Sequence, residues 1–325
     1  MPYPAPAGVV SHTGVGGLTL GGGMGYLSRR FGLTIDSMIE ADIVTADGRR
    51  LRVDGEEQPD LFWALRGGGG NFGVVTRFKF RMHDLGPVAI RRWTYPVAGL
   101  AATLRRYRDA IANAPRELTT AFVVTRDELM LRAVYSGTTA GAASALSHLR
   151  LPGAIEDPRS DMTFVELQRA SDDLLHWGRR YYSKGGFLGD MNDDVISVIA
   201  DSVRSSPLPG LEVYCLALGG AVADINEDAT AYSGREASFY WISQGAWDDR
   251  EDDDAAIGWC RRTASRLMEL SMTTNYVNEQ ADTGVARSSY GESKYRRLAQ
   301  LKARYDPVNV FRLNQNIVPG ASGPR

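Results

Sequence analysis

Two clusters of glycine near the start of the chain constrain its fold more than any other feature of the sequence. Seven of the twelve residues 14–25 are glycine, and a second cluster, residues 67–70 with Gly73, follows about forty residues later. A run this rich in glycine is unfavourable inside a helix or strand. We therefore expect both clusters to be loops in which the backbone closely approaches a ligand or another segment.

The spacing of the first cluster excludes the simplest phosphate-binding and catalytic motifs. A dinucleotide fingerprint, G-x-G-x-x-G, fails at its third glycine both from Gly14 and from Gly21. A Walker loop and a G-x-S-x-G nucleophile elbow are absent. Two interpretations remain open: a nest of backbone N–H groups that holds a pyrophosphate, or a tight crossing of two backbone segments.

Hydrophobic periodicity predicts two domains in an α+β arrangement. In the first, residues 38–45 and 50–53 are expected to form a hairpin, residues 60–66 a short helix and residues 74–82 a strand. From about residue 88 strands and amphipathic helices alternate, which predicts an antiparallel sheet covered by helices on one face. The strands are expected at 90–95, 119–125, 129–135, 211–218 and 239–247; the helices are expected at 98–112, 140–149, 194–203, 253–270 and 292–305, before an extended tail at 311–318.

Composition excludes several other classes of protein. The 325 residues include 37 basic and 39 acidic side chains, a net charge of -2, which is unsuited to binding a nucleic acid backbone. No apolar run approaches the roughly 20 residues that span a bilayer. The two cysteines and four histidines are scattered, so neither disulfides nor a metal site is expected. We expect a soluble, cytoplasmic protein.

Four segments together resemble one family of flavoenzymes. They are residues 10–25 (VSHTGVGGLTLGGGMG), 32–37 (GLTIDS), 60–73 (DLFWALRGGGGNFG) and 305–316 (YDPVNVFRLNQN). In this order they resemble the berberine-bridge-enzyme-like FAD oxidoreductases of the vanillyl-alcohol-oxidase, or PCMH-type, fold. The resemblance implies an FAD-binding lobe at residues 1–87, a substrate domain at 88–300 and a C-terminal return at 301–325.

The resemblance also implies which residues contact FAD. The cofactor-binding residues implied are Thr13, Gly14, Val15, Gly16, Gly17, Gly21, Gly22, Gly23, Tyr26, Ile43, Val44, Asn314 and Asn316. Members of this family attach FAD through a histidine in a preceding lobe that has no counterpart in this sequence, and many use a cysteine that falls here at Val10. FAD is therefore expected to bind without a covalent link, and His12 is expected to be structural.

Candidate catalytic residues follow from a second family motif. The base in this family is often the last residue of a Tyr-x-Asn-Tyr stretch, which reads Tyr276-Val277-Asn278-Glu279 here. The resemblance leaves three alternatives: Glu279 is the base, Tyr276 is the base, or the site serves another reaction. A second family position for an acid or amide falls at Ile242, which cannot transfer protons. Alternation along residues 239–247 places Tyr240 and Gln244 on one face, where they are expected to line a substrate pocket.

These features predict an FAD-dependent oxidoreductase that oxidises an alcohol or amine carbon of a sugar or secondary metabolite, with O2 as the electron acceptor. The alternative is a non-catalytic remnant of the flavin fold that acts as a binding or partner module. Without the first lobe of the family, an apolar face of the second lobe is expected to be exposed, which favours an oligomer or aggregate.

Overall fold

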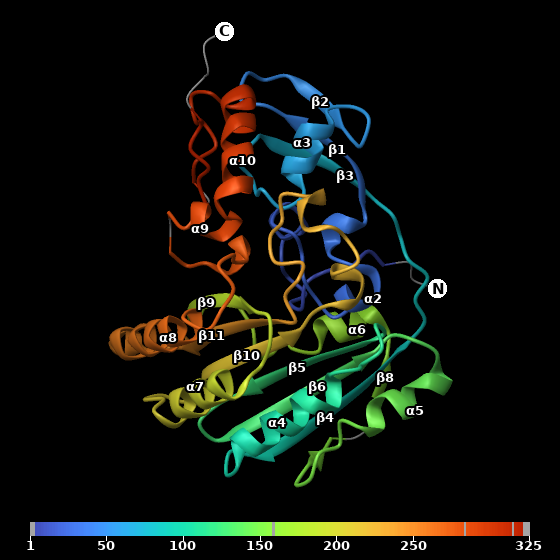
Figure 1. Ribbon diagram of the computed structural model, residues 1–325, viewed down its shortest axis with the longest axis vertical. Helices are drawn as coiled ribbons and strands as arrows, with labels where there is room; N and C mark the ends of the chain where they lie inside the picture. Colours follow the sequence, from blue (N-terminus) through green and yellow to red (C-terminus); the bar gives the residue numbers. More distant parts are fainter. Residues whose placement is uncertain (1–3, 158–159, 283, 314, 321–325) are drawn as a thin grey trace.

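The computed structural model describes residues 4–157, 160–282, 284–313 and 315–320, and the structural statements below concern these residues. They form a small three-stranded sheet and a large eight-stranded sheet. Figure 1 shows the part with the small sheet stacked on one face of the large sheet, with the last helices of the chain beside it. The α+β fold class is as expected.

The small sheet has β1 (Met38–Val44) at its centre, between β2 (Arg50–Val53) and β3 (Val74–Phe80), and both pairings are antiparallel. The β1–β2 turn requires a glycine, because Gly48 has φ 81° and donates its N–H to Thr45 O at 2.9 Å. Helix α3 (Pro59–Leu65) packs on this sheet with its last five residues buried. The predicted elements of this region are confirmed.

The expectation that the whole first glycine cluster is a loop is wrong. Helix α1 (Val15–Leu20) lies within it, and Leu18 N–H donates to Gly14 O at 3.1 Å. A helix this short is stabilised by tertiary contacts rather than by propensity. Its last residue, Leu20, is buried in the core of the small part. The cluster becomes irregular only from residue 21 on, and helix α2 (Ser28–Phe31) follows it.

The large sheet runs in the order β7-β4-β6-β5-β10-β11-β9, with β8 also paired to β4, and every pairing is antiparallel. Its strands are β4 (Val88–Pro96), β5 (Leu118–Val124), β6 (Glu128–Tyr135), β7 (Ile155–Glu156), β8 (Ser160–Met162), β9 (Arg180–Leu188), β10 (Leu211–Ala217) and β11 (Phe239–Trp247). The five predicted strands are confirmed.

Strand β9 was not expected from the sequence. Its second half contains Gly185 and Gly186, which weaken a strand in isolation. Here they are required by packing, because a Cβ on Gly185 would lie 2.2 Å from Tyr240 Oη, and one on Gly186 would lie 2.8 Å from the Trp241 ring. The glycines therefore let β9 pair closely with β11.

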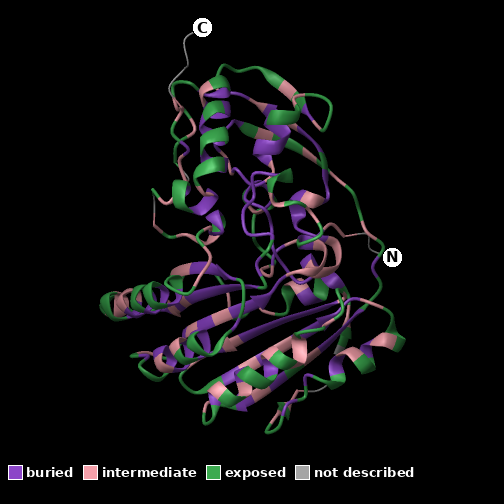
Figure 2. Ribbon diagram, viewed as in Figure 1, coloured by how far each residue is buried: buried purple, intermediate pink, exposed green. Residues whose placement is uncertain are grey.

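One face of the large sheet is covered by α4 (Leu100–Ile111), α5 (Thr139–Ser147), α7 (Asp193–Arg204) and α8 (Asp253–Met268), as predicted. In Figure 2 the sheet and the helix faces against it are buried, whereas the outer helix faces are exposed. The other face packs against the small part, where Leu216 and Ile242 share a cluster with Met24 and Ile35. The short helix α6 (Phe164–Arg169) lies on this second face. A site between the two parts is thus open to side chains from both.

The chain returns to the small part earlier than expected. Helices α9 (Ala286–Tyr290) and α10 (Glu292–Tyr305) bury Tyr290, Tyr295 and Leu298 in one core with α3 and β1. The sequence prediction had placed residues up to 300 in the substrate domain. An amphipathic helix has the same sequence pattern whichever sheet it covers, so only the packing reveals the boundary between the two domains.

A half-buried arginine links the two parts of the molecule. The guanidinium of Arg29, in α2, donates to Leu118 O at 2.8 Å and to Ala114 O at 3.0 Å on the large sheet side.

In the residues that the structure describes, every helix is too short or too polar to cross a bilayer. The same residues include no group of three or more His, Cys, Asp and Glu side chains suited to a metal ion.

Candidate active site

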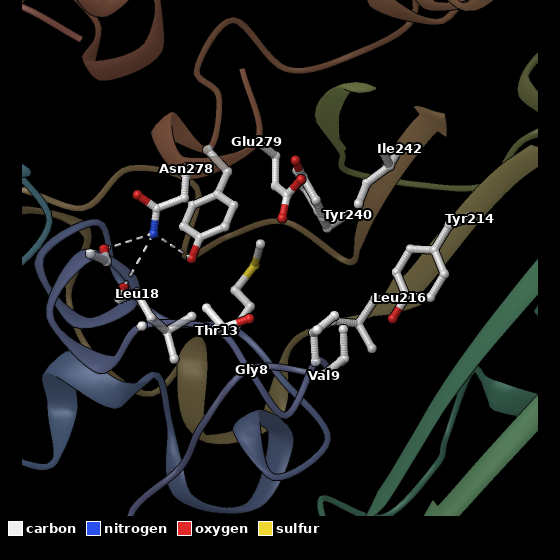
Figure 3. Close-up of a pocket in the computed structure, with 15 residues that line it drawn as sticks. Gly8, Val9, Thr13, Leu18, Tyr214, Leu216, Tyr240, Ile242, Asn278 and Glu279 are labelled. Atoms are coloured by element: carbon white, nitrogen blue, oxygen red, sulfur yellow. Dashed lines mark hydrogen bonds between the residues drawn. The ribbon is translucent and has the colours of Figure 1, made fainter. Parts of the chain in front are cut away.

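A cavity of about 440 Å³ lies between the first glycine cluster (residues 14–25, the glycine segment) and the second face of the large sheet. Four stretches of chain form its walls (Figure 3): residues 8–24, strand β10, strand β11 and the segment that follows α8. The lining residues are Gly8, Val9, Val10, Thr13, Gly14, Gly17, Leu18, Met24, Tyr214, Leu216, Tyr240, Ile242, Tyr276, Asn278 and Glu279. The walls are thus mainly apolar and aromatic, and Glu279 supplies the carboxyl group among these lining residues.

The two halves of the glycine segment have different roles. Nothing lies within 4 Å of a Cβ added to Gly14, Gly16 or Gly17, so the backbone there is open to a ligand. A Cβ on Gly22, which has φ +130°, would lie 2.6 Å from the Tyr232 ring. The first half therefore exposes its backbone at the cavity, and the second half packs against protein side chains.

Asn278 joins the glycine segment to the segment of Glu279. Its Nδ2 lies 3.1 Å from Gly17 O, 3.2 Å from Leu18 O and 3.0 Å from Tyr276 Oη (Figure 3). A Cβ on Gly21 would lie 2.1 Å from Asn278 Oδ1, so only glycine allows this approach. These contacts fix residues 276–279 against the backbone that borders the cavity.

The carboxyl group of Glu279 has an unusual environment. Glu279 ends a 3₁₀ turn, Val277–Glu279, and Figure 3 shows its side chain pointing into the cavity beside Tyr240. Burial among apolar and aromatic groups raises the pKa of Glu279 to about 7. A carboxyl group with this pKa exchanges protons readily at neutral pH, as a general base or acid must.

The Tyr276 hydroxyl accepts hydrogen bonds from Gly23 N–H at 3.2 Å and from Asn278 Nδ2 at 3.0 Å. Burial, reinforced by the Glu279 charge, raises the pKa of Tyr276 to about 12 despite these two donors. Tyr276 is therefore a neutral phenol at physiological pH, with a proton that it can donate. Of the two predicted bases, Glu279 has the pKa suited to the role.

Two more tyrosines of the sheet border the cavity. Burial raises the pKa of Tyr214 and of Tyr240 well above the usual value. Neither hydroxyl has a hydrogen-bond partner in the described structure. Since buried hydroxyls normally have partners, both are suited to contact a bound molecule. The sequence indicates Tyr240 but not Tyr214. The pairing of β10 with β11 places Tyr214 at the cavity, and the sequence of β10 alone does not reveal this pairing.

Several predicted residues lie elsewhere. Gln244 does not reach the cavity, because its amide donates to Glu212 Oε1 at 2.6 Å. Tyr26 is buried outside the lining, where its hydroxyl accepts from Arg132. In β1, Ile43 is in the core of the small part and Val44 is half-buried beside it, both away from the cavity lining.

The predicted cofactor residues Gly21, Gly22 and Gly23 do not line the cavity; they pack against the side chains of Asn278, Tyr232 and Thr34. Val15 is exposed, and neither it nor Gly16 is among the lining residues, unlike Thr13, Gly14 and Gly17. Asn316 lies in the C-terminal tail, where its Oδ1 is buried without a partner. The predicted Asn314 lies outside the described residues.

Asn71, from the second glycine cluster, holds this tail in place. Its Nδ2 donates to Gln315 O at 3.1 Å, and its Oδ1 accepts from Ile317 N–H at 3.0 Å. Lys302 is completely buried and donates to Asn71 O, to Asp306 Oδ2 and to Phe311 O at 2.5–2.7 Å. Neither residue was singled out from the sequence, in which a lone Asn or Lys gives no signal.

Known proteins resemble the chain along nearly its whole length. The family model "FAD binding domain" matches residues 2–54, and "Berberine and berberine like" matches residues 275–318. An FAD-linked oxidoreductase of Dictyostelium discoideum is 31% identical over 97% of this chain and 70% of the relative. Glucooligosaccharide oxidase of Sarocladium strictum is 27% identical over 94% of this chain and 68% of that protein.

A solved structure agrees with the fold. BBE-like 1 of Physcomitrella patens superposes with a TM-score of 0.89 at 21% identity, over 98% of this chain and 73% of that one. This confirms the predicted combination of a PCMH-type FAD-binding lobe and an antiparallel substrate domain. With the 31% identical relative, it shows that the chain belongs to the berberine-bridge-enzyme-like FAD-linked oxidoreductases.

Proposed function

We propose that this oxidoreductase oxidises an alcohol or amine carbon of a small molecule, such as a sugar or secondary metabolite, with Glu279 as the base and O2 as the electron acceptor. The observation that supports the proposal is the carboxyl group of Glu279, with a pKa of about 7, in the wall of an apolar cavity. A base of this strength removes a hydroxyl or ammonium proton at neutral pH.

The residues present fit the flavin part of FAD. The open backbone at Gly14 and Gly17 leaves room for a flat ring system, as no side chain occupies that space. The cavity of about 440 Å³ is within the usual range for small-molecule sites, about 300–1,000 Å³, and its apolar walls suit an aromatic ring. When bound, FAD supplies the capacity to accept a hydride from carbon.

The residues of the chain supply the acid–base chemistry and the orientation. Glu279 accepts the proton that leaves the oxygen or nitrogen of the substrate. The hydroxyls of Tyr214 and Tyr240, which lack partners, orient that substrate on the sheet side. Tyr276 stays protonated and, through its hydrogen bonds with Asn278 and Gly23, holds residues 276–279 against the glycine segment.

FAD binds this chain without a covalent bond in our proposal. Val10 lines the cavity at the position where many relatives have a cysteine, and an aliphatic side chain forms no thioether. The nearby His12 ring is within 2.7 Å of Leu175 O and packs against Trp177, at 4.8 Å between ring centroids. Its contacts are those of a structural residue. Acid precipitation of the loaded protein should leave all flavin in the supernatant.

Glu279→Gln, with Glu236→Gln as the control at an exposed carboxylate, tests the proposal. We would incubate each protein with FAD, desalt it, record the flavin absorbance and measure H2O2 release from a panel of alcohols, amines and sugars. Glu279→Gln should retain flavin and lose about 10²–10⁴-fold in kcat. Full activity in Glu279→Gln would contradict the role of Glu279 as the base. Substrate-dependent flavin reduction without H2O2 would contradict O2 as the electron acceptor.

We also propose that the chain self-associates. Large apolar side chains are exposed in the C-terminal tail, where Val308 is 75% exposed and Leu313 is 94% exposed. Exposed apolar groups gathered in one segment of chain favour association. Size-exclusion chromatography with light scattering should show a mass above 35.5 kDa that increases with concentration. A monomer at every concentration would refute this expectation.

A further inference from the structure

One row of side chains crosses the cavity-facing side of the large sheet. Directly paired residues of antiparallel strands lie on the same face. The pairing joins Tyr240 to Leu216, Leu216 to Ala121, Ala121 to Arg132 and Arg132 to Arg92. The row therefore leads from the active-site wall on β11 and β10 to two arginines on β6 and β4.

The distance along this row is that of a small molecule. Neighbouring strands are about 4.8 Å apart, so the backbones of Leu216 and Arg132 are separated by roughly 10 Å. Only the methyl group of Ala121 lies between them in the row. Arg132 is thus two strands, and Arg92 three strands, from the active-site wall on β10. Ala121, the residue of the row between Leu216 and Arg132, is buried and lines neither cavity.

A second cavity, of about 120 Å³, lies at the arginine end. We call it the arginine pocket; its residues are Ile90, Arg92, Arg132, Asp157, Met162, Leu167 and Ala170. Apart from its three charged side chains, the pocket is apolar. The Arg92 side chain is 44% exposed, so a charged group that enters the pocket would be partly removed from water, which strengthens its interaction with the arginines.

The charges of the arginine pocket do not balance. Like charges directly opposite each other on a sheet are destabilising, and Arg92 faces Arg132. Asp157 forms an ion pair with Arg92. Arg132 contacts neutral oxygens instead, the Tyr26 hydroxyl and, at 3.5 Å, Ser171 Oγ. Within the described residues no carboxylate lies in ion-pair distance of Arg132, so the pocket has one excess positive charge.

The charge of Arg132 also reaches the active-site wall. The Tyr214 side chain, which lines the active-site cavity, has a pKa raised by burial, and the charge of Arg132 opposes that rise. Tyr26 acts on Tyr214 as well and is bonded to Arg132, so these three side chains are neighbours. Arg132 of the arginine pocket and Tyr214 of the active-site wall therefore interact electrostatically, and the row of paired residues relates the two cavities.

We propose that the arginine pocket binds a carboxylate at the far end of the substrate, with Arg132 as the principal partner, while the carbon to be oxidised lies beside Glu279. This inference rests on the proposed function, because it assigns the second cavity to the substrate of the first. It makes a hydroxy acid or amino acid with an apolar middle section a better ligand than its neutral ester.

The test measures binding without turnover, so that it does not depend on the proposed oxidation. Isothermal titration calorimetry would compare 10-hydroxydecanoic acid, its methyl ester and acetate on the whole chain at neutral pH. Three variants complete the design: Arg132→Gln, Arg132→Lys and, as a matched control, Arg106→Gln. Arg106 is an exposed arginine of α4, on the opposite side of the sheet.

The acid should bind the unsubstituted protein at least about tenfold more tightly than the ester, since a charge-assisted hydrogen bond contributes more than a neutral one. Arg132→Gln should abolish this difference, whereas Arg132→Lys and Arg106→Gln should preserve it. Equal binding of acid and ester, or no binding of either, would overturn the proposal. Acetate that binds as tightly as the hydroxy acid would also overturn it, by indicating a free anion site.

Failure of the proposed oxidation and failure of the arginine pocket give different results. If the pocket prefers the acid but the FAD-loaded protein oxidises no substrate in the panel, the proposed oxidation fails and the arginine pocket stands. If oxidation proceeds with the same KM for acid and ester, the pocket fails and the oxidation stands.

Discussion

Replacement of Glu279 by glutamine should change how the stability of the fold depends on pH. Glu279 is half-buried, and its pKa is raised from 4.5 to about 7 because burial disfavours the charged carboxylate. In the unfolded chain the same group is expected to titrate at its ordinary value. A glutamine in its place would keep the shape of the side chain but would remain neutral at every pH, so the variant isolates the cost of the buried charge.

The direction of the effect follows from proton linkage. Between pH 4.5 and about 7 the folded protein holds the proton that the unfolded chain has released. The stability that the fold gains by holding this proton is fully present below pH 4.5. It is lost as the pH rises to about 7, the pKa of Glu279 in the folded protein. One pKa unit corresponds to about 1.4 kcal/mol, so the buried carboxylate costs roughly 3 kcal/mol above pH 7.

Urea unfolding of the flavin-free protein over a range of pH tests this prediction. The free energy of unfolding of Glu279→Gln relative to the unsubstituted protein should increase by roughly 3 kcal/mol from pH 4.5 to above pH 7. Glu236→Gln, at an exposed carboxylate, should show no such trend. A difference for Glu279→Gln that stays constant with pH would refute the assignment of Glu279 as a buried, proton-exchanging group.

Three further sets of substitutions test how the site is supported. Asn71→Ala removes the tail contacts and should cost about 2–4 kcal/mol in urea unfolding and reduce flavin retention after desalting; unchanged retention would exclude a positioning role. Lys302→Met leaves the fully buried Asp306 uncompensated and should cost about 3–5 kcal/mol, part of which the added change Asp306→Asn should restore. Gly22→Ala should lower the Tm, because φ is +130° and a ring fills the space, whereas Gly16→Ala, with open space, should not.

Local sequence patterns were sufficient for most of the regular elements. Strand β11 has the bounds that its alternation predicts, and α10 ends where Asp306-Pro307 interrupts the helix. Strand β9 and helix α1 were missed because glycine disfavours both in isolation. In the folded chain Tyr240, Trp241 and Asn278 occupy the space beside glycines of these two regions, so tertiary contacts override propensity.

The candidate site was foreseen only in part. The family motif led to Tyr276 and Glu279, and the glycine cluster led to the open backbone at Gly14 and Gly17. The predicted pocket residue Gln244 pairs instead with Glu212 across the strands. Period-2 alternation identifies the face of a strand, but the partner strand decides which side chain is available to a ligand.

The sequence by itself determined the glycine clusters, the order of strands and helices, and the presence of a carboxyl group in the Tyr276–Glu279 stretch, because these depend on residue type and short-range spacing. The tertiary structure decided the rest. The pKa of Glu279 depends on groups that are distant in sequence, and the alignment of Tyr240, Leu216, Ala121, Arg132 and Arg92 depends on strand register. Burial and register are properties of pairs of segments, and no single segment encodes them.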